Sequence, residues 1–359
     1  MKRPYAPSGF ALLLVLAVIA LLGVITVGLN TRVVSHTLVL QEYANSQKAY
    51  ALATSGVEIA KVALKLDAWE NKSDSFFDRW AEMPKSIEDK QLAGTIALTI
   101  EDEAAKLNPN AFLGNTQGAT SNRPGDEQPS ASGANPPTKG TQSPGQANQD
   151  PERKVSNEAH EGTNRQGAKL EELQEVLERL FEKLGLDQGR LESLMDWLDR
   201  DDEPRPNGTE RDFYQNLTPP YAPTNGPLGT LIEIRLIKGF DHETFKKLMP
   251  YLTVWSEGRV NVNTADKLVL ESLSSKISPF VADDIIKARE NEPLEDKAEL
   301  QKIPGLSDEL AGGVLNYMDI ASSTFRILST GNVGSSQETI ECIVQRKDDG
   351  FTVLRWVWL

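Results

Sequence analysis

The sequence predicts an α+β protein, in which a long N-terminal helix and an antiparallel sheet are accompanied by a large inserted helical domain. The helix is indicated by an uncharged run over residues 10–29 and by the absence of proline between Pro7 and Pro84. The sheet is indicated by alternating residues near 95–101 and by three strand-like segments at the C-terminus. The helical domain is indicated by apolar stripes that follow capping residues.

Composition limits the classes of function that this chain of 359 residues can have. Its 52 acidic and 38 basic residues give a net charge of −14, which disfavours broad contact with nucleic-acid phosphates. Cys342 is the one cysteine, so an internal disulfide and a site of several thiolates are excluded. The histidines lie too far apart in sequence to indicate a zinc cluster or a catalytic triad: His36, His160 and His242.

The N-terminus predicts a membrane segment. Lys2 and Arg3 precede an uncharged run of about twenty residues, which is long enough to cross a bilayer as a helix. A cleaved secretory peptide has a shorter apolar region and a small-x-small cut site, and TVGLNTR ends this run without a clear one. Two interpretations stay open. One is an ordinary signal anchor; the other is a prepilin-type leader, in which a cut after Gly9 exposes Phe10 as the new amino terminus.

The membrane helix is expected to continue outward as one amphipathic rod to about Leu66. Positions that step by 4 and 3 residues are apolar or aromatic, with one serine among them: Val39, Tyr43, Ser46, Tyr50, Ala53, Val57, Ala60 and Leu64. Residues 1–9 are therefore assigned to a leader, 10–68 to the transmembrane and stalk helix, and 69–111 to the first part of the sheet domain.

A linker is expected after this first part of the sheet domain. Residues 112–168 consist largely of Gly, Pro, Ser, Asn and Gln, and they contain almost nothing to bury. This composition is typical of a disordered segment. The alternative is a binding tail that becomes ordered on a partner.

Residues 169–320 are expected to form the inserted helical domain. A first helix is predicted by a leucine stripe that ends at Gly185: Leu170, Leu173, Leu177, Leu180 and Leu184. Later helices are predicted by N-cap residues: Asp187, Asp241, Thr264, Ser278 and Ser307. Residues 321–359 then supply three strands that close the sheet, with a turn over 348–350 between the last two.

Residues 196–214 form a proline-rich acidic loop, in which a calcium site is predicted. Like charges at this density repel one another unless solvent or a cation neutralises them, and carboxylates on an irregular loop suit Ca²⁺. The spacing of Asp199, Asp201 and Glu210 matches positions of an EF-hand, but Pro204 stands where that loop requires glycine. A solvated loop paired with local arginines and a hydrolase acid–base pair are the alternatives. The acidic residues are Asp196, Asp199, Asp201, Asp202, Glu203, Glu210 and Asp212.

The segment 256–320 resembles helix–hairpin–helix modules, which bind DNA phosphates through glycine-containing hairpins. IPGLS offers one such glycine and ISPFVADD offers none. The segment also carries seven basic and thirteen acidic residues. DNA binding is therefore disfavoured, and we expect a structural helical scaffold, similar to SAM or helix–hairpin–helix domains.

Four parts of the chain resemble the K-type minor pseudopilins of type II secretion, the GspK family. These parts are PSGF at the leader, IEDEAAKLNPNAF, VNVNTA, and the long segment DWLDRDDEPRPNGTERDFYQNLTPPYAPTNGPLGTLIEIRLIKGF. The resemblance implies a pilin-like fold for the helix and sheet. It also implies a non-enzymatic role in exporting folded proteins across the outer membrane, with a single-pass anchor in the inner membrane and a periplasmic C-terminal domain.

The resemblance further implies roles for individual residues. A prepilin peptidase would cut after Gly9 and methylate Phe10. Leu14, the fifth residue of the mature chain, stands where most pilin-like subunits carry glutamate, which implies a place at the pseudopilus tip where assembly is initiated. The calcium that the family binds implies these ligands, matched residue by residue: Asp199, Asp201, Glu210, Asp196, Asp202 and Asp212.

The implied partners are the other minor pseudopilins (I, J and H types), the major pseudopilin, the prepilin peptidase, the inner-membrane secretion platform and the exported proteins. A membrane is among them and nucleic acid is not. Two other classes stay open on the residues alone. One is a pilin-like component of a type IV pilus or DNA-uptake machine, and the other is a signal-anchored periplasmic enzyme.

Overall fold

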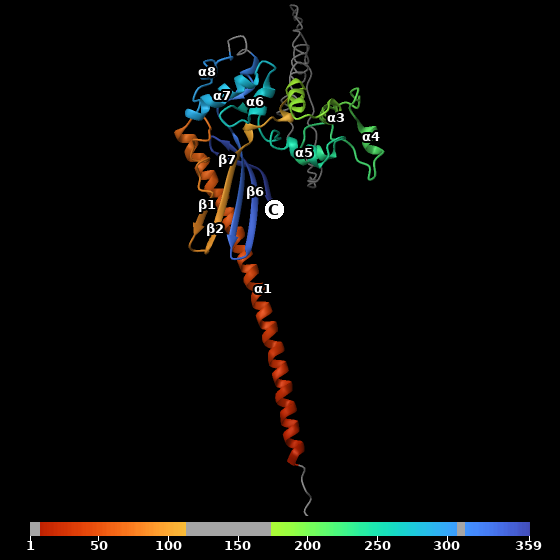
Figure 1. The fold of residues 1–359 in the computed structure, drawn as a ribbon, viewed down its shortest axis with the longest axis vertical. Coiled ribbons are helices and arrows are strands. Elements are labelled where there is room, and N and C mark those ends of the chain that lie inside the picture. Colours follow the sequence, from red (N-terminus) through yellow and green to blue (C-terminus); the bar gives the residue numbers. More distant parts are fainter. Residues whose placement is uncertain (1–7, 113–173, 307–312) are drawn as a thin grey trace, which may run out of the picture. The chain divides into compact units, whose positions relative to one another are not determined.

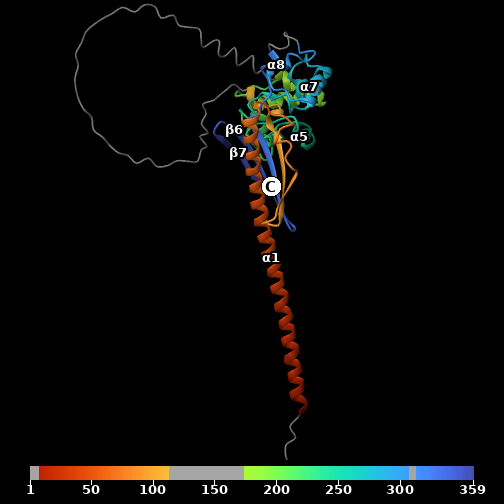
Figure 2. The same cartoon turned by 90° about the vertical axis from the view of Figure 1, so that its left-hand side faces the viewer.

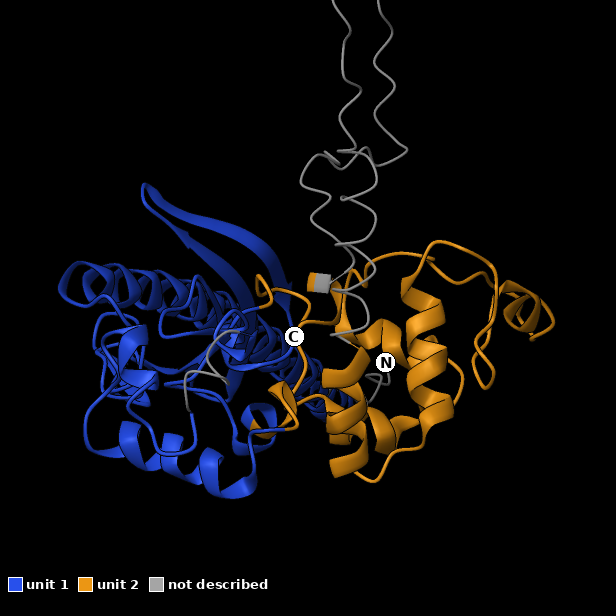
Figure 3. Ribbon diagram, turned by 90° about the horizontal axis from the view of Figure 1, so that it is seen from above, with its two compact units in different colours: residues 1–107, 259–270, 276–359 blue, residues 108–258, 271–275 orange. Residues whose placement is uncertain are grey.

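The computed structural model describes residues 8–112, 174–306 and 313–359. Contacts divide the chain into two compact units, coloured separately in Figure 3. Unit 1 comprises residues 1–107, 259–270 and 276–359, and unit 2 comprises 108–258 and 271–275. The predicted linker 112–168 lies, apart from its first residue, outside the described part of the chain.

Helix α1 (Ser8–Glu70) is the longest element of unit 1 and confirms the predicted N-terminal rod. Figures 1 and 2 show that it continues well beyond the strands that accompany its C-terminal half. Its apolar N-terminal stretch has a mean hydropathy of 3.0 over eighteen residues and is not buried within the protein. The stretch is long and apolar enough to cross a bilayer, and it fits a single-pass membrane anchor.

Five antiparallel strands form the sheet of unit 1, in the order β1-β2-β5-β6-β7. The strands are β1 (Ser86–Asp89), β2 (Gly94–Asp102), β5 (Thr324–Val333), β6 (Ser336–Lys347) and β7 (Gly350–Trp358). The last four of them were predicted, including the turn before Gly350. Strand β1 was not predicted, because SIED is short and polar and shows no apolar alternation.

The core of unit 1 lies between α1 and the sheet. Ala53, Val57, Ala60 and Leu64 follow one face of the helix and are all 0% exposed. They pack with residues of three strands and with Trp80, whose ring meets that of Phe325 edge to face at 5.4 Å. The predicted stripe is therefore buried only in its second half. Its earlier members Val39, Tyr43 and Tyr50 stay exposed.

The sequence placed residues 169–320 in one inserted domain, but 259–270 and the described residues of 276–320 belong to unit 1 with the sheet. The first of these two segments contains VNVNTA. Strand β3 (Val260–Asn261) pairs in parallel with β4 (Met318–Asp319). The Asn261 side-chain nitrogen lies 2.9 Å from the Asp74 carbonyl oxygen and 3.0 Å from Asp102 Oδ2. These buried hydrogen bonds attach residues 259–264 to the loop after α1 and to the end of β2, which explains why the contacts group them with the sheet.

The same network explains why one predicted helix cap is wrong. Thr264 was expected to cap the following helix, but its hydroxyl donates to Asp102 Oδ2 at 2.5 Å. Helix α6 (Lys267–Leu273) begins three residues later, and Asp266 Oδ1 accepts from the Leu268 backbone nitrogen at 2.8 Å. Ser278 caps α7 (Pro279–Asn291) as predicted, and α8 (Lys297–Leu300) is capped by Asp296. The predicted cap Ser307 lies outside the described residues.

Unit 2 consists of short helices, two of which flank the acidic loop. A helix over 174–183 ends at Gly185, whose φ of +67° and backbone hydrogen bond to Glu182 confirm the predicted C-cap. Helix α3 (Gln188–Leu198) begins at the predicted N-cap Asp187. The other elements are η2 (Pro109–Phe112), α4 (Arg211–Gln215), η3 (Leu231–Leu236) and α5 (His242–Leu248), the last capped by Asp241 as predicted.

Candidate metal centre

The acidic loop connects the end of α3 to the start of α4 within unit 2. Asp199 is the C-cap residue of α3 and Glu210 is the N-cap residue of α4. Pro204 and Pro206 prevent a helix between them, so the chain folds back and returns Glu210 to Asp199. Asp199, Asp201 and Glu210 each offer one carboxylate oxygen, and these three oxygens all lie within 4.8 Å of one another.

Glu210 is the least satisfied carboxylate of this group. Its side chain is only 6% exposed, and neither of its oxygens has a hydrogen-bond partner among the described residues. The same is true of Asp199 Oδ1, whereas Asp199 Oδ2 accepts from Arg205 Nη1 at 2.5 Å. A buried carboxylate without donors is costly, and the free oxygens of Glu210 and Asp199 are of the kind that a cation would stabilise.

The electrostatics of the loop agree with this conclusion. Burial, followed by the negative charges of Asp196, Asp199, Asp202 and Asp201, raises the pKa of Glu210 to about 7. Burial also raises the pKa of Asp199, against the hydrogen bond and charge of Arg205. Arg205 therefore does not offset the burial of these two carboxylates, and a bound cation would lower both pKa values.

The structure does not bring the other predicted ligands to the same point. Asp196 is fully buried, and its Oδ1 accepts from Arg205 Nη1 at 2.6 Å. Asp202 is exposed, and its Oδ1 accepts from Asn225 Nδ2 at 2.9 Å. Asp212 lies in the first turn of α4 and is exposed. Asp196 thus holds the loop through Arg205, while Asp202 closes it from outside.

Aromatic packing holds the two helices that carry the ligands. The Trp197 ring at the end of α3 meets the Tyr214 ring of α4 edge to face at 5.2 Å, and both side chains are buried. Tyr221 packs on Tyr214 at 5.4 Å, and its hydroxyl donates to the Leu236 carbonyl oxygen at 2.6 Å. The ends of the loop are therefore fixed before any ion binds, which lowers the ordering cost of a site.

The donor set of this loop fits Ca²⁺. All three converging groups are carboxylates, which are the hard oxygen ligands that calcium prefers, and Asp201 is exposed and leaves access for water. Their separation is compatible with a common ion, because oxygens on opposite sides of a calcium ion lie about 5 Å apart at ~2.5 Å bonds.

The predicted processing and assembly residues all lie on α1. Gly9 and Phe10 are in its first turn, and Leu14 follows one turn later with 54% of its surface exposed. Sequence reasoning missed a second group of acidic residues, Asp67, Asp74 and Asp78, which meet where α1 ends. Their spacing of seven and four residues was the only available signal, and it is not specific.

Comparison with known protein families identifies the chain. Two family models, both described as type II secretion system (T2SS), protein K, match residues 155–257 and 260–317. The chain belongs to the GspK family of type II secretion pseudopilins. Protein K of Pseudomonas aeruginosa is 24% identical over 356 residues, which covers 96% of this chain and 90% of that protein. Protein K of Klebsiella pneumoniae is 25% identical over 191 residues, half of this chain and 59% of that protein.

A solved structure has the same fold. It is the complex of GspK, GspI and GspJ from enterotoxigenic Escherichia coli, with a TM-score of 0.63 and 22% identity over 90% of this chain and 99% of that chain. The first family model contains the whole acidic loop, and the second begins at Val260 in the VNVNTA segment. Membership of the GspK family makes the chain a structural component of type II secretion, a minor pseudopilin, and it gives no support to the pilus, DNA-uptake or enzyme alternatives.

Proposed function

We propose that this GspK-family chain is the tip subunit of the type II secretion pseudopilus, where it initiates assembly and helps folded proteins to cross the outer membrane without catalysing a reaction. One observation carries the proposal: residues 10–29 contain no charge, and Leu14 stands at the fifth position of the mature chain. A carboxylate at that depth is costly unless it is paired with a positive group. A subunit with no neighbour above it has no amino terminus to pair with such a carboxylate.

The partners follow from the same proposal. The amine of Phe10 would receive the glutamate of the subunit below, and α1 would pack against the helices of the other minor pseudopilins (I, J and H types) and of the major pseudopilin. The relative solved with GspI and GspJ supports the first two of these partners. The inner-membrane platform, the prepilin peptidase and the exported proteins complete the set, with the C-terminal domain in the periplasm.

Replacing Leu14 by glutamate is expected to reduce pseudopilus initiation and secretion at least tenfold, because it gives the subunit a carboxylate that has no partner above it. Secretion of an exoprotein and immunogold imaging of the fibres measure the effect. Leu14→Ile is the control for a change of side chain at the same depth, and it should behave as the wild type. Unchanged initiation in Leu14→Glu, or wild-type copies spaced along the fibre shaft, would refute the tip position.

Processing at the leader gives a second expected result. The mature chain should begin at Phe10 with a methylated amine, because a prepilin-type cut falls after Gly9 and leaves the apolar helix intact. Mass spectrometry of the chain purified from membranes measures this directly. A chain that still begins at Met1, or one that begins near Thr31, contradicts the pseudopilin scheme.

We also propose that the acidic loop binds a structural calcium ion through Asp199, Asp201 and Glu210. The unpaired, buried oxygens of Glu210 support this, as does the convergence of three carboxylates that are eleven residues apart along the chain at most. The ion would neutralise a loop that has two prolines and no apolar core of its own. Asp196, Asp202 and Asp212 would then act around the ion rather than on it, since each lies outside the converging group.

A further inference from the structure

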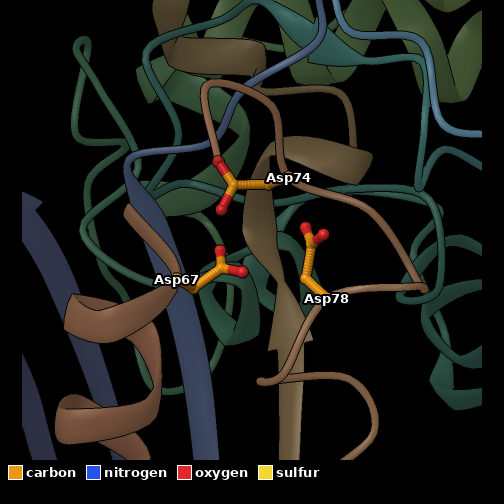
Figure 4. A group of neighbouring side chains, drawn as sticks. All are labelled: Asp67, Asp74 and Asp78. Atoms are coloured by element: carbon orange, nitrogen blue, oxygen red, sulfur yellow. The ribbon is translucent and has the colours of Figure 1, made fainter. Parts of the chain in front are cut away.

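A second group of buried carboxylates lies in unit 1, at the C-terminal end of α1. Asp67 is in the last turn of the helix, and Asp74 and Asp78 are in the loop that follows it. Their side chains are 1%, 1% and 5% exposed. One oxygen of each lies within 4.8 Å of one oxygen of each other, and Figure 4 shows the three carboxylates turned toward one another.

Each carboxylate is oriented by neighbouring donors. The Asn71 side-chain nitrogen donates to Asp67 Oδ1 at 3.1 Å and to Asp78 Oδ1 at 3.0 Å, so it bridges the two. The Ser75 backbone nitrogen donates to Asp78 Oδ2 at 2.5 Å. Arg346 Nη2 on strand β6 donates to Asp74 Oδ2 at 2.7 Å. These hydrogen bonds fix the orientation of all three carboxylates.

One oxygen is left over. Asp67 Oδ2 is buried, and no hydrogen-bond donor among the described residues reaches it. The nearest positive group is Arg346 Nη1 at 3.8 Å, which is too far for a hydrogen bond. Figure 4 shows the Asp67 carboxylate beside those of Asp74 and Asp78.

The charge of the cluster is not balanced by the chain. Three carboxylates face one guanidinium, and when all are ionised a charge of −2 is left in a buried place. The C-terminal end of a helix adds a partial negative charge at Asp67. Burial, followed by the charges of Asp78 and Asp74, raises the pKa of Asp67 to about 7 against the opposing effect of Arg346. Either a proton or a divalent cation must compensate this charge.

We propose that Asp67, Asp74 and Asp78 form a second cation site, which binds a divalent ion of the calcium class. The donors are again hard oxygens, the free Asp67 Oδ2 supplies a vacant ligand position, and an ion of charge +2 balances the cluster. The site shares no residue with the acidic loop. It ties the end of the membrane-anchored helix to strand β6 through Arg346, and to residues 320–322 through the backbone and side chain of Asp74.

The charge of the cluster is compensated either by a bound ion or by a shared proton. Measuring calcium binding to the full-length chain in detergent distinguishes these two alternatives. The acidic loop is first disabled by the double variant Asp201→Asn/Glu210→Gln, and calcium is measured by equilibrium dialysis at pH 8. We expect this chain to retain one ion. Adding Asp67→Asn should weaken that binding at least tenfold, while adding Asp349→Asn, an exposed aspartate between β6 and β7, should leave it unchanged.

Chemical denaturation of the single variant Asp67→Asn provides the second measurement. In chelator this isosteric change should leave stability equal or higher, because it removes a buried negative charge, and it should reduce the stabilisation that added calcium gives. A purely hydrogen-bonding role predicts instead a lower stability that is independent of calcium. The proposal is overturned if the double variant binds no calcium, or if Asp67→Asn changes neither binding nor the calcium response. Asp78→Asn repeats the test should Asp67→Asn fail to fold.

Discussion

Replacing Gly331 by alanine is expected to lower the free energy of unfolding by about 3 kcal/mol, at the upper end of what added volume in a packed core costs. Gly331 lies in β5 where the strand passes directly under α1. A Cβ atom there would overlap the Ala49 carbonyl oxygen, and would lie 2.8 Å from the Ala49 carbonyl carbon and 2.9 Å from the Ala53 nitrogen. These are backbone atoms of a helix, so they cannot move aside as a side chain can.

The same close approach is visible from the helix. A Cβ atom on Gly56 would overlap Ser329 Oγ and would lie 2.7 Å from Ile96 Cγ2. Glycines on both partners thus let the backbone of α1 lie against the sheet, and this contact holds the helix to the sheet of unit 1. Urea denaturation of the full-length chain in detergent measures the loss. Gly313→Ala is the matched control, because nothing lies within 4 Å of the atom it adds; an equally small effect of both variants would contradict the prediction.

Calcium is expected to stabilise the wild-type chain by about 2.7 kcal/mol more than the Glu210→Gln variant, when the ion is present at a hundred times the dissociation constant of the loop site. Both oxygens of Glu210 are buried and have no hydrogen-bond partner among the described residues, so the variant removes the charge of the least satisfied carboxylate in the loop. Glu203→Gln is the control, since Glu203 is exposed and outside the converging group. Comparing wild type with variant cancels the contribution of any other calcium site. An equal calcium effect in wild type and Glu210→Gln would refute the loop site.

The pH dependence of the same measurement has a definite sign. Because the pKa of Glu210 in the folded chain is about 7, the carboxylate must release a proton before it binds the ion. The calcium effect should therefore weaken as the pH is lowered from 8 to 6. In chelator, stability should change with pH in the opposite direction. Between the Glu210 pKa values of the unfolded and the folded chain, the folded chain keeps a proton on Glu210 that the unfolded chain has already released. The Glu210 contribution to stability then falls as the pH rises from about 4.5, where an unfolded glutamate titrates, toward 7.

Local patterns in the sequence predicted the elements whose stability is local. The uncharged run and the proline-free stretch specified α1, the alternation specified β2 and the last three strands, and four of the described caps stand where they were predicted. The acidic loop belongs to the same class, since its three converging carboxylates lie within twelve consecutive residues and the prolines between them force a return.

Features that depend on distant residues were not predictable in this way. The sequence around Thr264 is typical of a helix cap, but in the folded chain its hydroxyl donates a hydrogen bond to Asp102, which is far away in sequence. Strand β1 carries no apolar alternation of its own and forms because β2 offers an edge. The assignment of residues 259–270 to the sheet unit likewise rests on the hydrogen bonds of Asn261 rather than on composition.

The membrane helix, the strand pattern and the acidic loop can thus be read from neighbouring residues, because hydrophobic periodicity and turn chemistry act over short stretches of chain. The cluster of Asp67, Asp74 and Asp78 is formed only in the tertiary structure. The charge of these three aspartates lacks compensation because folding removes them from water and brings a single arginine, Arg346, to them from the far end of the chain. Desolvation is a property of the packed interior, and no local pattern of residues encodes it.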